Sequence, residues 1–328
     1  MTTHPEFLDA KRTIEDRALN RRVFDRFADA LADRAAEQAA EPDWAGEKAA
    51  DCDRAGEQAG APAEPVRIVE VGAGTGSMIA RLADWGALPP RVDYRAVDLD
   101  AAVIDLAGRR LPERLSAAGY RVDHVADGEA ERLVARQPGD GINRRIEITL
   151  EVGDGFAIDD AADAVIAAAV LDLVDLQPAV EELKGLLADG GLLYAPFTFN
   201  GHTSFLPREP VDDLIERLYH RHMDEVREQP GDSRAGQKLL QTLPAADYTV
   251  LEAGGADWTV RPVDGAYPAD ESTALEHLLS TIDGALADYP VEVIDPDTRT
   301  AWIEQRREQV ARGELTLVAH HLDVLARL

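Results

Sequence analysis

The chain has 328 residues, enough for one large α/β domain or two small ones, and 45% of them are hydrophobic. Its 62 acidic residues outnumber 34 lysines and arginines, and the resulting net charge of −28 argues against nucleic-acid and anionic-membrane partners. The single Cys52 excludes an internal disulfide and a cysteine-based metal site, and neither a signal peptide nor a transmembrane run is evident, so we expect a cytoplasmic protein.

The acidic composition is combined with a scarcity of lysine, which occurs only at positions 11, 48, 184 and 238. This acidic, lysine-poor composition resembles that of cytosolic proteins from extreme halophiles. Like charges repel one another in dilute buffer, and salt screens that repulsion. We therefore expect a protein that salt stabilises, with an acidic mesophilic protein as the alternative.

The N-terminal segment is predicted to be helical. Apolar residues such as Phe24 recur at helical spacing from residue 6 to about residue 34. Between them lies a polar cluster that includes Lys11, Arg17 and Asn20. The cluster could face a ligand, or it could be a solvated face with ion pairs four residues apart.

Two segments lack the periodicity of a core element. Residues 35–65 consist mainly of Ala, Glu, Asp, Gly and Pro, which predicts a flexible acidic linker or surface insertion. Residues 121–143 are polar and punctuated by glycine, and we expect a surface excursion there.

The stretch 66–76 organises the rest of the chain. Residues 67–71 predict a short apolar strand, and a helix is predicted to follow the stretch. Between strand and helix, glycines stand at every second position: Gly72, Gly74 and Gly76. Glycine permits positive φ and a close approach of ligand to backbone. The first turn of the helix adds unpaired N–H groups, so the stretch predicts a ligand-binding turn.

Further strands alternate with helices along the chain. The second strand, 91–97, ends in Asp98, about 20 residues beyond the glycines, where a doubly wound sheet holds ribose hydroxyls. Strands are also predicted at 146–152, 164–169 and 192–199. This alternation predicts an α/β fold with a doubly wound sheet, whose ligand crevice lies at the carboxyl ends of the strands.

The glycine spacing separates two ligand classes. In Glu70-Val-Gly-Ala-Gly-Thr-Gly the third glycine comes one residue earlier than in the G-x-G-x-x-G dinucleotide fingerprint. The motif resembles the first motif of the class I S-adenosylmethionine (SAM)-dependent methyltransferases, and Val97-Asp98-Leu99-Asp100 is similar to that family's acidic strand end. The resemblance is specific over 66–199 and architectural beyond.

The resemblance implies a seven-stranded, mostly parallel sheet with an antiparallel last hairpin, and SAM as cofactor. Asp98 would hold the ribose. Asp154 would meet the adenine amino group, with a turn-forming Asp-Gly as its alternative role. The implied cofactor-binding residues are Glu70, Gly72, Ala73, Gly74, Gly76, Asp98, Leu99, Asp154, Gly155 and Phe156.

Asp172 follows the fourth predicted strand, at the mouth of the crevice. It stands where nucleic-acid and glutamine amino-methyltransferases carry an Asn/Asp-Pro-Pro-Tyr motif. The absence of that motif argues against a nucleic-acid acceptor and favours a small molecule. Asp172 could approach the sulfonium or the acceptor, or it could cap the following helix.

Asn200 and His202 follow the fifth predicted strand, in a loop at the same edge of the sheet. Loops there commonly carry function, and imidazole titrates near neutral pH, so His202 is a candidate general base beside Asp172. The alternative is an exposed loop histidine. No histidine pair in the sequence has metal-ligand spacing, and we predict no metal site.

The N-terminal helix resembles the one that precedes the first strand in many class I methyltransferases. We predict that residues 5–34 form a lid over SAM, with Lys11 and Asn20 near the acceptor. Arg17 would face inward and hold a carboxylate or another anionic group. Because the predicted sheet begins after this segment, we expect a chain without its first 34 residues to fold.

The domains expected are therefore a lid helix (1–34), a linker (35–65) and a methyltransferase domain (66–328) with helical cap segments at about 203–245 and 268–312. The expected activity is SAM-dependent methyl transfer to an oxygen, nitrogen or carbon of a small molecule. A catalytically silent SAM-binding or scaffold protein and an NAD-type dinucleotide-binding oxidoreductase are the alternatives. The sequence leaves the oligomeric state open.

Overall fold

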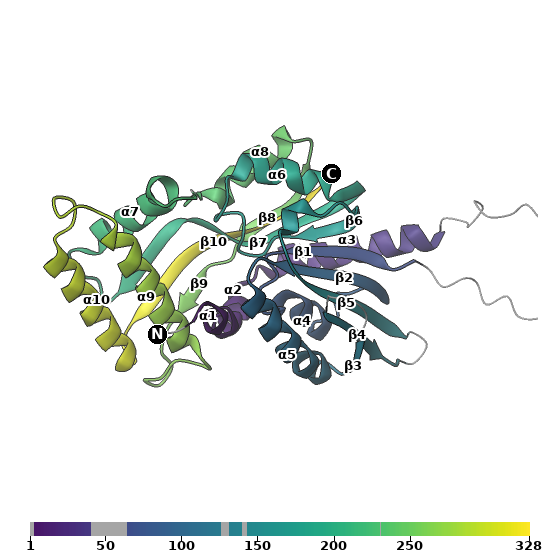
Figure 1. The fold of residues 1–328 in the computed structure, drawn as a ribbon, viewed down its shortest axis with the longest axis horizontal. Helices are drawn as coiled ribbons and strands as arrows, with labels where there is room; N and C mark the ends of the chain where they lie inside the picture. The colour runs from purple at the N-terminus through teal and green to yellow at the C-terminus, as the bar shows by residue number, and fades with distance from the viewer. Residues whose placement is uncertain (1–2, 41–63, 126–130, 140–142, 230) are drawn as a thin grey trace, which may run out of the picture.

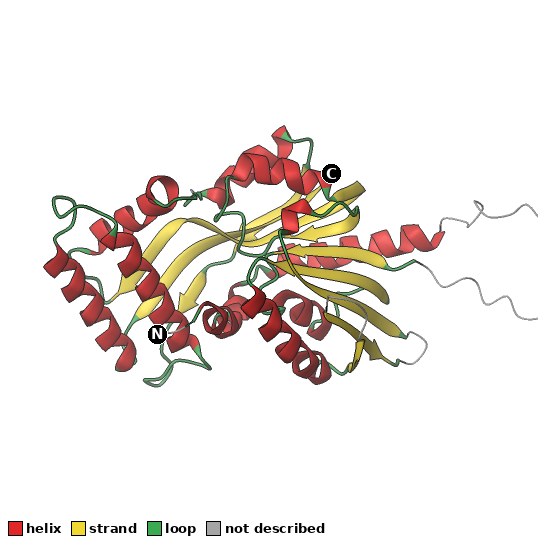
Figure 2. Ribbon diagram, in the orientation of Figure 1, coloured by secondary structure: helices red, strands yellow, loops and turns green. Residues whose placement is uncertain are grey.

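The computed structural model describes residues 3–40, 64–125, 131–139, 143–229 and 231–328. Within them, ten strands form one sheet with helices on both faces (Figures 1 and 2). The strands are β1 (Val66–Val71), β2 (Arg91–Asp98), β3 (Arg121–Val125), β4 (Glu131–Gln137), β5 (Arg144–Val152), β6 (Ala162–Ile166), β7 (Leu187–Leu206), β8 (Thr249–Gly255), β9 (Trp258–Val260) and β10 (Thr316–Arg327). The α-helices are α1 (His4–Ala10), α2 (Arg12–Ala18), α3 (Arg21–Ala40), α4 (Ser77–Asp84), α5 (Ala101–Ala117), α6 (Leu176–Gly185), α7 (Asp212–Arg221), α8 (Ala235–Ala245), α9 (Glu271–Ala287) and α10 (Pro296–Ala311).

The strand order is β3-β4-β5-β2-β1-β6-β7-β10-β8, and β9 pairs with β10. The central strands β5, β2, β1, β6 and β7 run parallel to one another, and β10 lies antiparallel between β7 and β8. The predicted α/β class with a parallel centre is confirmed. Because the order reverses direction at β1, the carboxyl ends of β1 and its neighbours border the crevice of a doubly wound sheet.

The predicted number of seven strands is wrong. The segment 121–143, expected to be a surface excursion, contributes β3 and β4, which extend the sheet antiparallel to β5. Leu133 and Ala135 of β4 are fully buried between arginine and glutamate residues. Polar residues on both sides of this short apolar centre masked the strand pattern in the sequence. Backbone hydrogen bonds to β5 also hold β4 in the sheet. β9 is the other strand the sequence did not predict.

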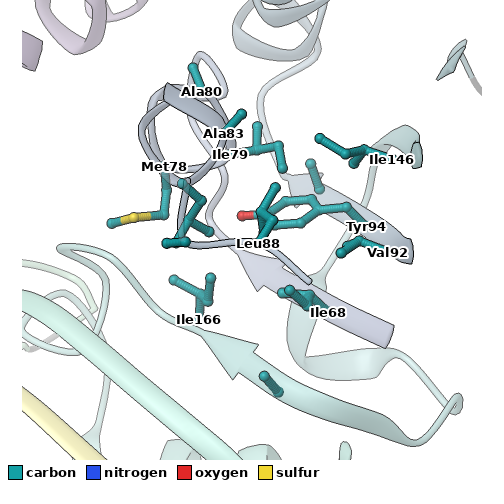
Figure 3. Packing of buried hydrophobic residues seen from close by; sticks show 14 of the residues in the cluster. Ile68, Met78, Ile79, Ala80, Ala83, Leu88, Val92, Tyr94, Ile146 and Ile166 are labelled. Carbon is teal, nitrogen blue, oxygen red and sulfur yellow. The ribbon is translucent and has the colours of Figure 1, made fainter. Parts of the chain in front are cut away.

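One face of the sheet carries α3, α4 and α5. Met78 and Ile79 of α4 pack over Ile68 of β1 and Tyr94 of β2, as Figure 3 shows. Each of these side chains is at most 2% exposed. Burying a large apolar side chain contributes roughly 1.5–3 kcal/mol, so this layer fixes α4, and with it the glycine turn that precedes α4.

The opposite face carries α6 and α8. Leu239 and Leu243 of α8 are fully buried in one cluster with Val324 of β10. The prediction that α8 belongs to the cap is therefore wrong, because its apolar side faces the sheet. Among the described residues, no helix combines the length and the apolarity needed to cross a membrane.

The cap is built on two long strands. β7 was expected to end at Phe199 but continues to Leu206, because residues 198–206 pair with β10. Helices α7, α9 and α10 pack around this extension, at the left of Figure 2, with Phe205 and Trp302 edge to face at 5.3 Å. The cap is thus an outgrowth of the sheet itself.

The N-terminal segment forms α1, α2 and α3, where one helix to residue 34 was predicted. Leu19 breaks the helix with an extended backbone (φ −50°, ψ 128°), and its side chain is buried. Asn20 then accepts a hydrogen bond from the N–H of Val23 and caps the start of α3. Helix α3 continues to Ala40, into the predicted linker, and the rest of that linker up to residue 63 lies outside the described residues.

Helix α3 is part of the main core. Phe27 and Leu31 are fully buried, and the Phe27 ring stacks on Tyr194 of β7 at 4.6 Å. A chain without residues 1–34 would expose this face of the sheet. These contacts argue against the expectation that such a chain folds unaided, since removing each buried aromatic side chain costs roughly 3–5 kcal/mol.

Candidate functional site

A cavity of about 320 Å³ lies at the carboxyl ends of β1, β2, β5 and β6, and we call it the strand-end cavity. Its volume is within the range of small-molecule sites. Of the residues that the sequence assigned to a cofactor, all except Gly76 line it: Glu70, Gly72, Ala73, Gly74, Asp98, Leu99, Asp154, Gly155 and Phe156.

The glycine turn forms the floor of the cavity. Gly72 and Gly74 have φ of +65° and +56°, which other residues adopt only under strain. A Cβ on Gly72 would lie 2.5 Å from Val170, so only glycine fits there. Gly76 serves packing instead, because a Cβ at that position would lie 2.8 Å from Leu111 of α5.

Asp98 is held in a fixed orientation at the end of β2. Its Oδ2 accepts a hydrogen bond from the N–H of Gly74 at 2.9 Å, and its Oδ1 accepts one from Asp100 at 3.0 Å. Each carboxylate oxygen keeps a second lone pair for a ligand hydroxyl. The neighbouring Leu99 side chain is 75% exposed, which leaves an apolar surface at the cavity mouth.

Asp154 follows β5 at the same edge. Its Oδ1 accepts a hydrogen bond from the N–H of Phe156 at 3.0 Å and thereby caps a 3-10 helix (Gly155–Ala157). The turn-forming role and the ligand-facing position therefore coexist, since Asp154 and Phe156 both line the cavity.

Glu70 lies at the inner end of the cavity and is 1% exposed. The hydroxyl of Tyr94 donates a hydrogen bond to its Oε2 at 2.6 Å. Burial raises the pKa of Glu70 to about 8, against the opposing effects of the Tyr94 hydrogen bond and the positive charge of Arg81. Glu70 is therefore mostly protonated at neutral pH.

The N-terminal helices form the wall opposite the glycine turn, and Figure 1 shows α1 and α2 between the sheet and α9. Lys11 Nζ lies 2.9 Å from Glu15 Oε1, and Arg81 of α4 contacts Glu15 and Asp16. Arg81 is only 4% exposed, so this charged cluster is largely sequestered from water.

Lys11 was predicted at the site, whereas Glu15 and Arg81 were missed. A signal existed for Glu15, because Leu8, Lys11 and Glu15 are spaced three and four residues apart and share one helix face. All three line the cavity. Arg81 gave no such signal, since an arginine on the apolar helix α4 is indistinguishable in sequence from a surface residue.

Two predicted lid residues point elsewhere. Arg17 does not line the cavity but pairs with the buried Glu271 of α9, through N···O distances of 2.5 and 2.9 Å. Asn20 donates from its side chain to the carbonyl of Gly255 at 2.9 Å. Both residues therefore fasten the N-terminal segment to the cap and the sheet, and the predicted inward orientation of Arg17 is not observed.

Asp172 lies beside the cavity rather than on its surface, although its loop neighbours Val170 and Leu173 line it. Asp172 is 8% exposed, and its Oδ1 has no hydrogen-bond partner among the described residues. Burial raises the pKa of Asp172 to about 6, opposed by the backbone N–H groups of Asp172 and Phe199 and by the charge of Lys11.

Asn200 and His202 lie within β7, not in the predicted loop, because this segment pairs with β10. His202 Nδ1 is 3.1 Å from Glu216 Oε1, and the His202 side chain is half exposed. Asn200 accepts a hydrogen bond from the N–H of Gln237 at the start of α8. Neither residue lines the strand-end cavity.

No protein-family model matches the chain, and no curated protein matches it. The solved structures that match the chain include proteins described as methyltransferases. One from Bacillus halodurans is 12% identical, covers 80% of this chain and 92% of its own, and has a TM-score of 0.43. A protein described as a sarcosine dimethylglycine methyltransferase from Galdieria sulphuraria is 14% identical, with coverages of 80% and 78% and a TM-score of 0.38.

A geranyl diphosphate C-methyltransferase from Streptomyces coelicolor, solved with S-adenosyl-L-homocysteine (SAH), is 12% identical, with coverages of 80% and 73% and a TM-score of 0.35. Another similar structure was solved with SAM. At these identities and scores, none of these proteins determines what this chain binds or which acceptor it uses.

Proposed function

We propose that this chain transfers a methyl group from SAM to a small-molecule acceptor. The observation that supports this most is the position of Asp98 beside the glycine turn. Its carboxylate is fixed by the N–H groups of Gly74 and Asp100 at the ends of adjacent strands, and it borders a cavity of about 320 Å³. SAM supplies a methyl group activated by a sulfonium sulfur.

The residues of the cavity fit the parts of SAM. Asp98 would accept hydrogen bonds from the ribose hydroxyls, as carboxylates do at this place in doubly wound sheets. Asp154 and the apolar side chains of Leu99 and Phe156 would hold the adenine. The amino-acid end would lie over Gly72, where the absence of a side chain leaves room for close contact.

The chain's own contribution to rate would be alignment and exclusion of water. Transfer from a sulfonium is an in-line displacement, so fixing the two reacting groups removes much of the barrier. In this proposal the segment from α1 to α2 covers the site, because Leu8 and Lys11 line the cavity. Asp172 would act on the acceptor, because it lies beside the cavity and has an unpartnered oxygen. His202 is left out of the proposal.

The dinucleotide alternative fits less well. In the strand order common to dinucleotide-binding sheets, the strands run parallel to one another out to the edge of the sheet. Here the antiparallel β10 separates β7 from β8, and the glycine spacing also departs from the dinucleotide fingerprint.

Isothermal titration with SAM, SAH and NAD tests the proposal directly. We expect SAM and SAH to bind with one site per chain and NAD to show no heat of binding. Tight binding of NAD, or no binding of SAM, would refute it. Release of SAH in the presence of a metabolite extract then separates an active enzyme from a silent SAM-binding protein.

A further inference from the structure

Lys11 lies where the strand-end cavity meets the cap. Its Nζ is 5.9 Å from the ring centre of Phe7 and 5.8 Å from that of Trp258, within the range of a cation–π contact. The side chain is only 13% exposed. Glu15 occupies one of the three N–H donors of the ammonium, so others remain for a ligand.

Trp258 of β9 adds a second donor to this place. It is 8% exposed, and its Nε1–H has no acceptor among the described residues. A buried donor without a partner is costly, and native proteins rarely retain one without a reason. The rings of Trp258 and His321 lie 4.8 Å apart, and those of His321 and Phe199 lie 5.5 Å apart.

Asp172 is linked to this group through Phe199 and Lys11. The backbone N–H of Phe199 and the charge of Lys11 both act on its carboxyl, whereas Oδ1 accepts no hydrogen bond. The charge of Lys11 also acts on His321. We call these five residues the acceptor cluster: Lys11, Asp172, Phe199, Trp258 and His321.

We propose that the acceptor cluster binds the molecule that is methylated, and that this molecule carries both an amine and a carboxylate, as an amino acid does. This inference rests on the proposed function. The carboxylate would accept hydrogen bonds from Lys11 and Trp258, and the amine would donate one to Asp172. A simple amine would leave the Trp258 donor unpaired, and a simple acid would leave Asp172 unpaired.

The reaction at nitrogen is balanced without a further reactant. The lone pair of the free amine forms the new N–C bond while the C–S bond breaks, and the electron pair of that bond stays on sulfur. Positive charge thereby passes from sulfur to nitrogen, beside the Asp172 carboxylate, which stabilises it. An amino acid carries an ammonium group in water, so one proton is released to solvent when the free amine forms in the site, and the product leaves as the methylated ammonium.

Matched ligands test the proposed chemistry. The standard amino acids are titrated into the protein saturated with SAH, and each binder is compared with the amine and the acid that lack one of its groups. Phenylalanine, for example, is compared with phenethylamine and phenylpropionate. We expect at least one amino acid to bind, and loss of either group to weaken binding about tenfold or more. If no amino acid binds, or if an amine alone binds equally well, the inference is wrong.

The variant Trp258→Phe tests the role of the indole donor. It keeps an aromatic ring beside Lys11 and removes only the N–H. We expect KM for the amino acid to rise about tenfold, with kcat and the Kd for SAM nearly unchanged and no effect on the corresponding simple amine. Tyr248→Phe is the matched control, because it also removes a buried unpartnered polar atom, but in the cluster around α6 and α8.

The outcomes separate the two proposals. If wild-type protein binds no SAM, the proposed function fails and this inference falls with it. If SAM binds but Trp258→Phe and Tyr248→Phe have the same KM for the amino acid as wild type, only the inference fails.

Discussion

The carboxylate of Asp323, on β10, receives the backbone N–H of Asn20, at the junction of α2 and α3, at 2.8 Å. Its second oxygen accepts the N–H of Phe197, a residue of β7 with φ of +59°, also at 2.8 Å. Asp323 is fully buried, so one side chain holds together the N-terminal segment and the two long strands of the cap.

Replacing this anchor should destabilise the whole fold. In Asp323→Ala the N–H groups of Asn20 and Phe197 lose their acceptors, which should lower the free energy of unfolding by on the order of 3 kcal/mol. Urea denaturation measures the loss. Asp189→Ala, at an exposed position near the start of β7, is the control and should change stability little. Equal midpoints for the two variants would contradict this assignment.

The buried Glu70 should make stability depend on pH. Burial raises its pKa from an ordinary 4.5 to about 8, so the folded state binds the proton more tightly than the unfolded chain. The stability that protonated Glu70 contributes to the fold is complete below the pKa of the unfolded chain, and it is lost as pH rises through about 8. Glu70→Gln keeps an acceptor for Tyr94 without the ionisation, so it should flatten the fall in stability between pH 6 and 9. A slope unchanged from wild type would contradict the raised pKa.

Asp98 should govern SAM affinity. Asp98→Ala removes the proposed acceptor of the ribose hydroxyls and should weaken binding by roughly 1–3 kcal/mol, about fivefold to 150-fold. Asp100→Ala is the matched control, because its side chain caps α5 through the N–H of Ala102 and does not line the cavity. It should lower stability by about 1 kcal/mol and leave SAM affinity unchanged. Calorimetric titration of both variants tests the contrast.

The charge of the chain should make it dependent on salt. A net charge of −28 repels itself in dilute buffer, and the Debye length shortens to about 3 Å at molar salt. We expect Tm to rise by many degrees between dilute and molar potassium chloride, and to rise less in sucrose of equal osmolality. A Tm that does not change with salt concentration would refute the resemblance to halophilic proteins, but it would not bear on the proposed activity.

The sequence by itself determined the centre of the sheet and the cavity floor. Gly72, Gly74, Asp98 and Asp154 were predicted at one site, and the structure places them around one cavity. These predictions depend on local properties, namely the backbone freedom of glycine and the rule that parallel strands end at one edge.

Only the tertiary structure decided what faces that cavity from outside the sheet. Arg17 pairs with Glu271, 254 residues away. The segment around His202, expected to be a loop, is part of a strand because β7 pairs with β10. Lys11, between α1 and α2, and Arg81 of α4 both pair with Glu15, although they are 70 residues apart in the sequence. Such contacts depend on which distant surfaces pack together, and neither the periodicity nor the propensity of a segment carries that information.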